Sequence, residues 1–347
     1  MGKISVACGR DFRQRRCLMG ENEWQAALQD VISDPRELWE TLGLDPKLFS
    51  TIVEKQSTFP LRVPRGFVAK MERGNPKDPL LLQILPTLTE QIQAPHFSLD
   101  PLHEKKANTL PGLLHKYHGR VLITLATACA VNCRYCFRRH FPYSENNPGK
   151  AGWTAIFNYL REHPKVSEVI LSGGDPLMLR DLILKSFVSL LEEITSIKRL
   201  RIHTRFPVVI PERITQELSD LLSQSRFSTS MVLHINHPNE IDEALIHALQ
   251  KIRLTKTVLL NQSVLLKDIN DQADILIHLS ERLFEAGILP YYLNLPDRVQ
   301  GSAHFSVTEE KGRSLMKIMS AHLPGYLVPK LVREVPEAPS KIPLSFY

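Results

Sequence analysis

From Arg120 onward the sequence alternates between short apolar runs and longer amphipathic stretches. The apolar runs are rich in β-branched residues and have the length of buried strands, and the stretches between them have the apolar spacing of helices. Strands that alternate with helices form a parallel sheet with right-handed crossovers. The six predicted strands lie at 121–127, 166–171, 199–204, 228–236, 257–265 and 289–295.

Six such units predict an α/β fold, a partial (β/α)6 barrel whose open side another part of the chain must cover. We expect residues 1–110 to form a helical and extended covering region and residues 111–325 to form the barrel, with a C-terminal segment at 326–347. In barrels of this kind the chemistry takes place on the loops that follow the strands. Candidate functional residues are therefore expected in those loops.

The covering region has two predicted helices, at 21–32 and 34–42. Asp34 and Pro35 suit the N-cap and first-turn positions of the second helix. Residues 58–102 contain too many prolines for long helices, which predicts extended segments and turns that wrap the barrel.

The 347 residues are 43% hydrophobic and 23% charged, an ordinary globular composition. The net charge is +6, but the basic residues are scattered, so the charge does not indicate a nucleic-acid partner. No apolar run is long enough to span a bilayer, and the N-terminus lacks a signal-peptide pattern. We therefore expect a cytoplasmic protein that binds neither nucleic acid nor membranes. Two of its five cysteines, Cys8 and Cys17, have no predicted role.

The other three cysteines are crowded into eight residues directly after the first predicted strand. Cys129, Cys133 and Cys136 form a C-x3-C-x2-C pattern, and in a reducing compartment such clustering indicates a metal or cluster site. A closed zinc site needs a fourth ligand, for which His140 and His203 are candidates. A [4Fe–4S] cluster can instead be held by three thiolates, with one iron open to a small molecule.

This cysteine pattern, with an aromatic residue before its third cysteine, resembles the radical S-adenosylmethionine (SAM) superfamily. The resemblance implies a [4Fe–4S] cluster whose open iron binds SAM and whose electron cleaves it to a 5′-deoxyadenosyl radical. Ser172, Gly173, Gly174 and Asp175 follow the second predicted strand and resemble the superfamily's glycine motif, which implies a contact with SAM. Without the cysteines, these four residues would predict only a turn.

Further segments extend the resemblance along most of the chain. They are FPLRVP (59–64), HKYHGRVLIT (115–124), CRYCFRRHF (133–141), LSGGDPL (171–177), HINHPNE (234–240), DRVQGSAHF (297–305) and the segment around Lys341. In order and spacing they resemble the lysine 2,3-aminomutases, and within them the short form that supplies (R)-β-lysine for modification of translation elongation factor P. This resemblance implies an isomerase that moves the amino group of L-lysine from Cα to Cβ and uses pyridoxal 5′-phosphate (PLP) besides SAM.

The residue in register with the family's PLP lysine is Lys341, which by its position alone would be a solvated tail residue. A lysine that reacts with PLP must be neutral, so we expect Lys341 to be desolvated or held near other cations. The resemblance implies that Lys116, Tyr117 and Arg120 bind the PLP phosphate. His234 contacts SAM or PLP, or is hydrogen-bonded structure, and the same alternatives hold for His237.

The resemblance also implies that Arg138 binds the α-carboxylate of the substrate, and that Asp297 and Glu334 bind its ε-ammonium. Two carboxylates favour a cationic side chain and reject glutamate, but they tolerate arginine or ornithine. Alternatively, Asp297 is a turn residue before Arg298, and Glu334 pairs with Arg333 or a nearby lysine at the surface.

Implied partners are L-lysine, an electron-donor protein and the ligase of elongation factor P, and a homodimer is expected. Because the chain lacks the later cysteines of larger relatives, no structural zinc is expected. Two other functions compete with the aminomutase. One is a radical SAM enzyme without PLP that modifies a macromolecule, and the other is a non-catalytic zinc or iron–sulfur module.

Overall fold

The computed structural model describes residues 23–346, and within them one large sheet has ten strands. Each strand lies beside its neighbours in the sequence. The pairs from β5 to β11 are parallel, whereas β3, β4 and β12 are antiparallel additions at the edges. Because every crossover proceeds in one direction, the sheet curls in one sense, as in a partial barrel. The strands are β3 (Asn108–Leu110), β4 (Leu113–Tyr117), β5 (Arg120–Ala126), β6 (Glu168–Gly173), β7 (Arg199–Thr204), β8 (Ser228–Leu233), β9 (Val258–Val264), β10 (Leu289–Asn294), β11 (Lys330–Arg333) and β12 (Ile342–Pro343).

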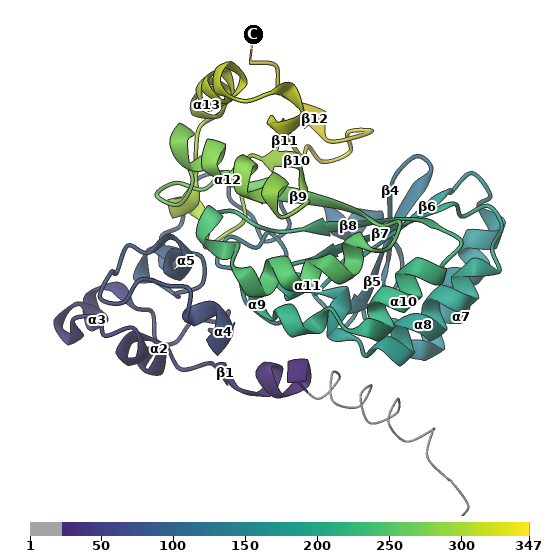
Figure 1. Ribbon diagram of the computed structural model, residues 1–347, viewed down its shortest axis with the longest axis horizontal. Coiled ribbons are helices and arrows are strands. Elements are labelled where there is room, and N and C mark those ends of the chain that lie inside the picture. Colours follow the sequence, from purple (N-terminus) through teal and green to yellow (C-terminus); the bar gives the residue numbers. More distant parts are fainter. Residues whose placement is uncertain (1–22, 347) are drawn as a thin grey trace, which may run out of the picture.

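The helices between the parallel strands lie along one face of the sheet (Figure 1). In α8, Leu184, Phe187, Val188 and Leu191 recur at helical spacing and are buried. Phe187 packs edge-on against Trp153 of α7, with ring centroids 5.1 Å apart. Burial of one such side chain contributes about 1.5–3 kcal/mol. The helices are α7 (Gly149–Glu162), α8 (Asp181–Glu192), α9 (Phe206–Val209), α10 (Gln216–Gln224), α11 (Glu243–Arg253), α12 (Ala273–Glu285) and α13 (Glu309–His322).

The six predicted strands are present as β5 to β10, and the predicted fold class is confirmed. Strand β8 ends at Leu233, earlier than expected, because the next backbone amides bind side chains: Ile235 N donates to Asn261 Oδ1 and Asn236 N to Glu240 Oε1. The six-unit pattern also omits β11, a seventh parallel strand of four residues. Its apolar core is only two residues long, too short to show a strand pattern.

The second predicted helix is α2 (Pro35–Thr41). Asp34 is its N-cap and accepts from Arg36 N at 2.8 Å, and Pro35 takes the first helical position, both as predicted. A carboxylate at this position satisfies an amide that the helix itself cannot.

The first predicted helix is shorter than expected. Residues 23–29 are helical, but Val31–Ile32 form strand β1, which pairs with β2 (Val63–Pro64).

Cys8 and Cys17 lie outside the described residues. No helix within residues 23–346 is long and apolar enough to cross a bilayer. The remaining short elements are α3 (Pro46–Ile52), α4 (Arg65–Val68), α5 (Pro79–Leu82), α6 (Glu104–Ala107), η1 (Leu88–Gln91), η2 (Pro176–Met178), η3 (Pro211–Arg213), η4 (Pro238–Glu240), η5 (Ala303–Phe305) and η6 (Gly325–Leu327).

Residues 58–102, all of them described, contain no helix longer than four residues, as their prolines predict. They pack on the loops at the C-terminal ends of the strands, and Figure 1 shows α4 and α5 gathered at that end of the barrel, near α9 and α12. Lys70 Nζ donates to Glu240 O at 3.0 Å and to Val208 O at 3.1 Å. This part of the covering region therefore lies over the loops expected to carry the chemistry.

The last part of the covering region, from Ser98 to Lys106, lies across the open side of the barrel. Ser98 pairs with Val299, which follows β10, and Lys106 Nζ lies 3.0 Å from the carboxylate of Glu337, which follows β11. The covering region thus connects the two edges of the sheet, as the incomplete barrel requires.

Candidate active site

The interior of the barrel carries polar side chains, whereas the face toward the helices is apolar. On β7, Leu200, Ile202 and Thr204 are buried, and Arg201 and His203 alternate with them and are less buried. Because side chains alternate along a strand, Arg201 and His203 point into the interior.

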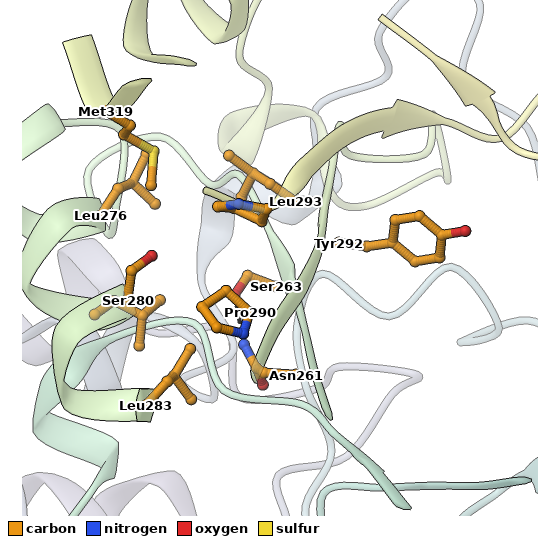
Figure 2. Close-up of a pocket in the computed structure, with 11 residues that line it drawn as sticks. Asn261, Ser263, Leu276, Ser280, Leu283, Pro290, Tyr292, Leu293 and Met319 are labelled. Atoms are coloured by element: carbon orange, nitrogen blue, oxygen red, sulfur yellow. Dashed lines mark hydrogen bonds between the residues drawn. The ribbon is translucent and has the colours of Figure 1, made fainter. Parts of the chain in front are cut away.

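A small pocket behind the sheet is not part of this interior. It lies between β9, β10, α12 and α13, and Leu276, Leu283 and Met319 contribute to its mostly apolar lining. Figure 2 shows the ring of Tyr292 pointing away from these side chains. The centre of that ring lies 6.0 Å from Lys341 Nζ, so Tyr292 belongs to the barrel interior.

The three clustered cysteines lie on the loop after β5, where the barrel fold places functional residues. Arg134 fixes this loop. Its side chain is 0% exposed and donates Nε and Nη2 to Glu90 and Nη1 to Phe59 O. A hydrogen bond of 3.0 Å from Cys136 N to Cys133 O closes a turn between the last two cysteines. The covering region therefore holds the cysteine loop in place.

The thiols themselves are free and half-buried. Burial raises the pKa of Cys136 to about 11 and that of Cys129 well above its usual value. Bound metal deprotonates such thiols, and neighbouring cations stabilise the thiolates. Arg205 is such a cation, with Nη1 2.7 Å from Cys133 Sγ.

These donors fit an iron–sulfur cluster better than a single zinc ion. Within residues 23–346, no three or more His, Cys, Asp or Glu side chains are grouped as ligands of one metal ion. His140, a candidate fourth zinc ligand, instead has Nε2 3.0 Å from Gln300 O. In a [4Fe–4S] cluster each thiolate binds a different iron, so the thiols need not meet at one point.

The glycine motif packs directly on the cysteine loop. A Cβ on Gly174 would lie 2.5 Å from Ala128 O, and one on Gly173, whose φ is +108°, would lie 2.6 Å from Thr124. Both glycines are therefore required by the contact between the two loops, in addition to the predicted approach of SAM. Tyr143 OH strengthens this contact by donating to Gly173 O at 2.7 Å.

Asp175, at the end of the glycine motif, is buried and fully hydrogen-bonded. Its carboxylate accepts from Thr204 Oγ1 at 2.7 Å and from the backbone amides of Leu177, Arg205 and Phe206. The Asp175 side chain is thus used within the protein, which leaves the backbone of the motif for the predicted approach to SAM. It contributes by tying the loop after β6 to the end of β7.

Arg205 is a site residue that the sequence argument omits. Besides Cys133, it donates from Nη2 to Gln83 Oε1 at 2.7 Å and to Glu240 Oε2 at 2.9 Å. One guanidinium thus joins the cysteine loop, the covering region and the loop after β8. The available signal is a basic residue directly after a predicted strand, in a barrel whose strand ends carry the chemistry.

Arg138 lies in the interior and is paired with a carboxylate of the covering region. Its Nε and Nη2 each donate to one oxygen of Glu104 at 2.7 Å, and the side chains are 7% and 5% exposed. Its Nη1 lies 3.3 Å from Oγ of Ser172 in the glycine motif. Glu104 is not recognisable from the sequence, because an acid followed by two lysines is typical of a solvated turn.

Lys341 and Glu334 meet inside the barrel. Lys341 Nζ lies 2.6 Å from Glu334 Oε2 and 3.1 Å from Asn294 Oδ1. Tyr117 OH donates to the other oxygen of Glu334 at 2.8 Å, and Lys116 Nζ lies 3.6 Å from that oxygen. Four predicted site residues from opposite edges of the sheet are therefore in contact.

These contacts bear on two expectations. Lys341 is partly desolvated, one of the two settings expected for it, with a side chain 26% exposed and Nζ paired with a carboxylate. Lys116 and Tyr117, which the resemblance assigns to the PLP phosphate, contact Glu334 in this structure. The reason is proximity across the open side of the barrel, which brings the end of β4 to the end of β11.

The two predicted ammonium-binding acids have opposite pKa shifts. Burial would raise the pKa of Glu334, but Lys341 and Lys116 outweigh it and lower that pKa to about 2. Burial raises the pKa of Asp297 to about 7, because Lys341 offsets only part of the desolvation. Glu334 does not form the alternative pair with Arg333, because the guanidinium of Arg333 binds Glu309 at the start of α13 instead.

The two histidines of HINHPNE have different surroundings. His237 accepts from Asn239 N at 3.2 Å and begins the short helix η4, which is a structural role. His234 Nε2 lies 2.7 Å from Gln262 Nε2 in the interior. Burial lowers the pKa of His234 to about 3 and that of His203 well below its usual value, so both rings are neutral.

Several interior groups fit an anionic aldehyde such as PLP. Arg120 lies 4.5 Å over the ring of Tyr117, and its guanidinium has no hydrogen bond within the described residues. His203 Nε2 is buried without a hydrogen-bond partner among them. Together with the amine of Lys341, these groups offer a cation, an unused ring nitrogen and a nucleophile.

Residues 123–258 match the family described as the radical SAM superfamily. This match, the fold and the cysteine loop define a protein of the radical SAM class. The L-lysine 2,3-aminomutase of Haemophilus influenzae is 49% identical over 332 residues, covering 96% of this chain and 98% of the relative. The enzymes of the same name from Escherichia coli and Buchnera aphidicola are 50% and 46% identical over 324 residues, each covering 93% of this chain and 94% and 95% of the relatives.

The chain therefore belongs to the L-lysine 2,3-aminomutase family. Membership implies three cofactors, a [4Fe–4S] cluster, SAM and PLP.

Proposed function

We propose that this chain is an isomerase that converts L-lysine to β-lysine by moving the amino group from Cα to Cβ. One observation carries the proposal: Arg138, the side-chain nitrogen of Lys341 and the acids Asp297 and Glu334 share one barrel interior. Lys341 Nζ lies 2.6 Å from Glu334, and Lys341, Glu334 and Glu104 are among the charges that influence the pKa of Asp297, which supports this grouping. Arg138 can bind the α-carboxylate of lysine, and Asp297 and Glu334 can bind its ε-ammonium. These groups therefore match the two ends of a lysine molecule.

Each substrate contact has a physical reason. Arg138 presents the Nη1–Nη2 edge of its guanidinium to the α-carboxylate, since Glu104 occupies the other edge. Glu334 is held ionised by its neighbours, and Asp297 ionises when a cation approaches, because its pKa lies close to neutrality. Glutamate would add a third negative charge to this end of the site and is therefore rejected.

The cofactors have matching residues. Cys129, Cys133 and Cys136 would hold the cluster, and SAM would bind at the glycine motif, which packs on the cysteine loop. Lys341 would hold PLP, with Arg120 at the phosphate. When bound, these groups supply radical chemistry and electron delocalisation that acid–base side chains cannot provide.

Other predicted cofactor contacts follow from the neutral and cationic groups of the interior. His234, positioned by Gln262, is proposed to contact SAM or PLP as a neutral ring. Lys116 and Tyr117 contact the PLP phosphate only if they leave Glu334. The chain itself contributes orientation and exclusion of water, because the covering region closes over the strand ends.

The activity is tested with protein reconstituted anaerobically with iron and sulfide and supplied with SAM, PLP and a reductant. L-Lysine, L-arginine and L-glutamate are incubated separately, and β-amino acids are measured by mass spectrometry. β-Lysine formation supports the proposal and conversion of glutamate is not expected. Absence of β-lysine with a fully loaded protein rejects it in favour of an enzyme without PLP or a non-catalytic cluster module.

The assignment of Lys341 is tested by borohydride reduction of PLP-loaded protein followed by peptide mapping. We expect a pyridoxyl adduct on Lys341 and none in a Lys341→Ala variant. Lys330→Ala is the matched control, because Lys330 is exposed at the start of β11 and should leave the adduct intact. An adduct on another lysine in the wild-type protein would contradict the assignment.

The ammonium site is tested by substitution of Glu334. In Glu334→Gln we expect L-lysine to bind at least tenfold more weakly, because one of the two negative charges is lost. Glu337→Gln is the control, since Glu337 is exposed and contacts Lys106 outside the interior. Equal affinities in the two variants, measured by calorimetry on PLP-loaded protein, would contradict this role.

We further propose a cytoplasmic enzyme and a homodimer that takes electrons from a donor protein. By the same resemblance, its β-lysine is proposed to be used by the elongation factor P ligase. A chain with a +6 net charge suits an acidic electron donor, whose binding should weaken as salt is added.

A further inference from the structure

The pair formed by Glu104 and Arg138 is a buried two-point contact with a defined orientation. Both oxygens of Glu104 accept from Arg138, each at 2.7 Å, from Nε and Nη2. A guanidinium is planar, so two parallel hydrogen bonds fix its plane as well as its position. The remaining Nη1–Nη2 edge is therefore aimed in one direction, and Nη1 lies 3.3 Å from Ser172 Oγ.

The backbone that carries Glu104 is itself fixed. Asp100 accepts from Glu104 N at 2.9 Å and from Lys105 N at 3.2 Å, which caps the one-turn helix α6. His103, directly before this helix, has a left-handed φ of +51°. Glu104 is thus held from both sides, by its own backbone and by Arg138.

Glu104 also contacts a second cation. Lys116 Nζ lies 3.5 Å from Glu104 Oε1 and 3.6 Å from Glu334 Oε1. With Arg138 at one end and Lys341 at the other, charges alternate in sign through the site. Glu104 therefore lies between Arg138, the proposed carboxylate-binding cation, and the charges around Glu334 at the proposed ammonium site.

We propose that Glu104 is a positioning residue that orients Arg138 so that its Nη1–Nη2 edge, beside Ser172 Oγ, receives the substrate α-carboxylate. The inference rests on the proposed function, because it needs an amino-acid substrate in this interior. An unclamped arginine has several rotatable bonds, and ordering them on binding costs free energy. Glu104 removes that cost by fixing the guanidinium beforehand.

The test compares two ligands that differ only at the carboxylate. L-Lysine and 1,5-diaminopentane, which lacks the carboxylate, are titrated into PLP-loaded protein without SAM or reductant, and binding is measured by calorimetry. In Glu104→Gln we expect L-lysine to bind at least tenfold more weakly and diaminopentane to change less than twofold. The amide can accept only one of the two hydrogen bonds, and its NH2 opposes the other donor.

Glu104→Asp separates positioning from charge. The charge is kept, but the shorter side chain cannot make both hydrogen bonds, so we expect a similar selective loss for L-lysine. Retained L-lysine affinity in this variant would overturn the positioning role. Glu309→Gln is the matched control, because Glu309 also binds an arginine, Arg313, through two hydrogen bonds but lies on α13 outside the interior.

The remaining outcomes are decisive as well. Equal loss for both ligands would show a general structural role, and unchanged or tighter L-lysine binding would show that Glu104 does not position Arg138. Either result overturns the inference. If the wild-type protein itself does not bind L-lysine, the proposed function fails, which this comparison distinguishes from failure of the Glu104 role.

Discussion

At the scale of single residues, the site is governed by how buried charges are paired. Asp297 and Glu334 are both acids enclosed by protein, yet burial keeps the pKa of Asp297 at about 7 whereas Lys341 and Lys116 lower that of Glu334 to about 2. The difference is explained by contact: Glu334 is hydrogen-bonded to its cation, and the carboxylate of Asp297 has no such bond within the described residues.

Asp297 should therefore make stability depend on pH. Its pKa is raised above the unfolded value, so the folded chain holds a proton between about pH 4 and pH 7 that the unfolded chain has lost, and stability falls as pH rises through this window. Asp297→Asn, which mimics the neutral acid, should lack this decline. The difference in unfolding free energy between variant and wild type should thus grow in favour of the variant up to about pH 7.

Urea unfolding at several pH values between 4 and 8 measures this difference. A difference that stays constant with pH would show that Asp297 is ionised normally in the folded chain. Asp268→Asn provides a control, because Asp268 is an exposed aspartate.

At the scale of elements, buried arginines fasten the functional loops to the barrel. Arg213, the last residue of η3, donates to Leu177 O and Leu179 O in the loop after β6 and lies 2.8 Å from Asp181 at the start of α8. These bonds join two successive βα units at the strand ends. These bonds add to the close packing of the glycines in holding the loop after β6 in place.

Arg213→Met should lower the free energy of unfolding by about 3–5 kcal/mol, because Asp181 would remain buried without its cation. Their side chains are 0% and 5% exposed, so solvent cannot compensate. Combining the change with Asp181→Asn should recover part of the loss. Urea unfolding of Arg213→Met, Asp181→Asn and the double variant measures the effect. A double variant whose loss of stability equals the sum of the two single losses would contradict the pairing.

The elements themselves were largely predictable. Helix α8 and strand β7 follow from local periodicity, and Asp34 identifies the start of α2. Strand β11 was not predictable, because four residues cannot show a pattern and its place beside β10 depends on the whole sheet.

At the scale of the whole molecule, the barrel is closed by side chains rather than by backbone pairing. Tyr117 of β4 and Glu334 after β11 are 217 residues apart in the sequence and hydrogen-bonded at 2.8 Å. The chain around Lys341 is attached to this closure through β12, a strand of two exposed residues. Apart from Lys341, this segment is held by the pairing of β12 with β11 and by Leu344 and Phe346, which pack against an apolar cluster.

We expect hydrogen exchange of residues 335–346 to be fast relative to β5–β9, and to slow when PLP is bound at Lys341. The physical reason is that a short edge strand opens easily unless its side chains are anchored. Mass-spectrometric exchange with and without PLP measures the change. The slowing should disappear in Lys341→Ala, and slowing that persists there would place the PLP contact elsewhere.

The sequence by itself determined the parallel sheet, the cysteine loop at its first strand end and the residue types of the site. These depend on local periodicity and spacing, which a few neighbouring residues set. Only the tertiary structure decided the partners: Glu104 for Arg138, Tyr117 for Glu334 and Arg205 for Cys133. A hydrogen bond needs its atoms placed within about 3 Å, and for residues far apart in the chain that placement follows from the way the sheet curls and the covering region closes it.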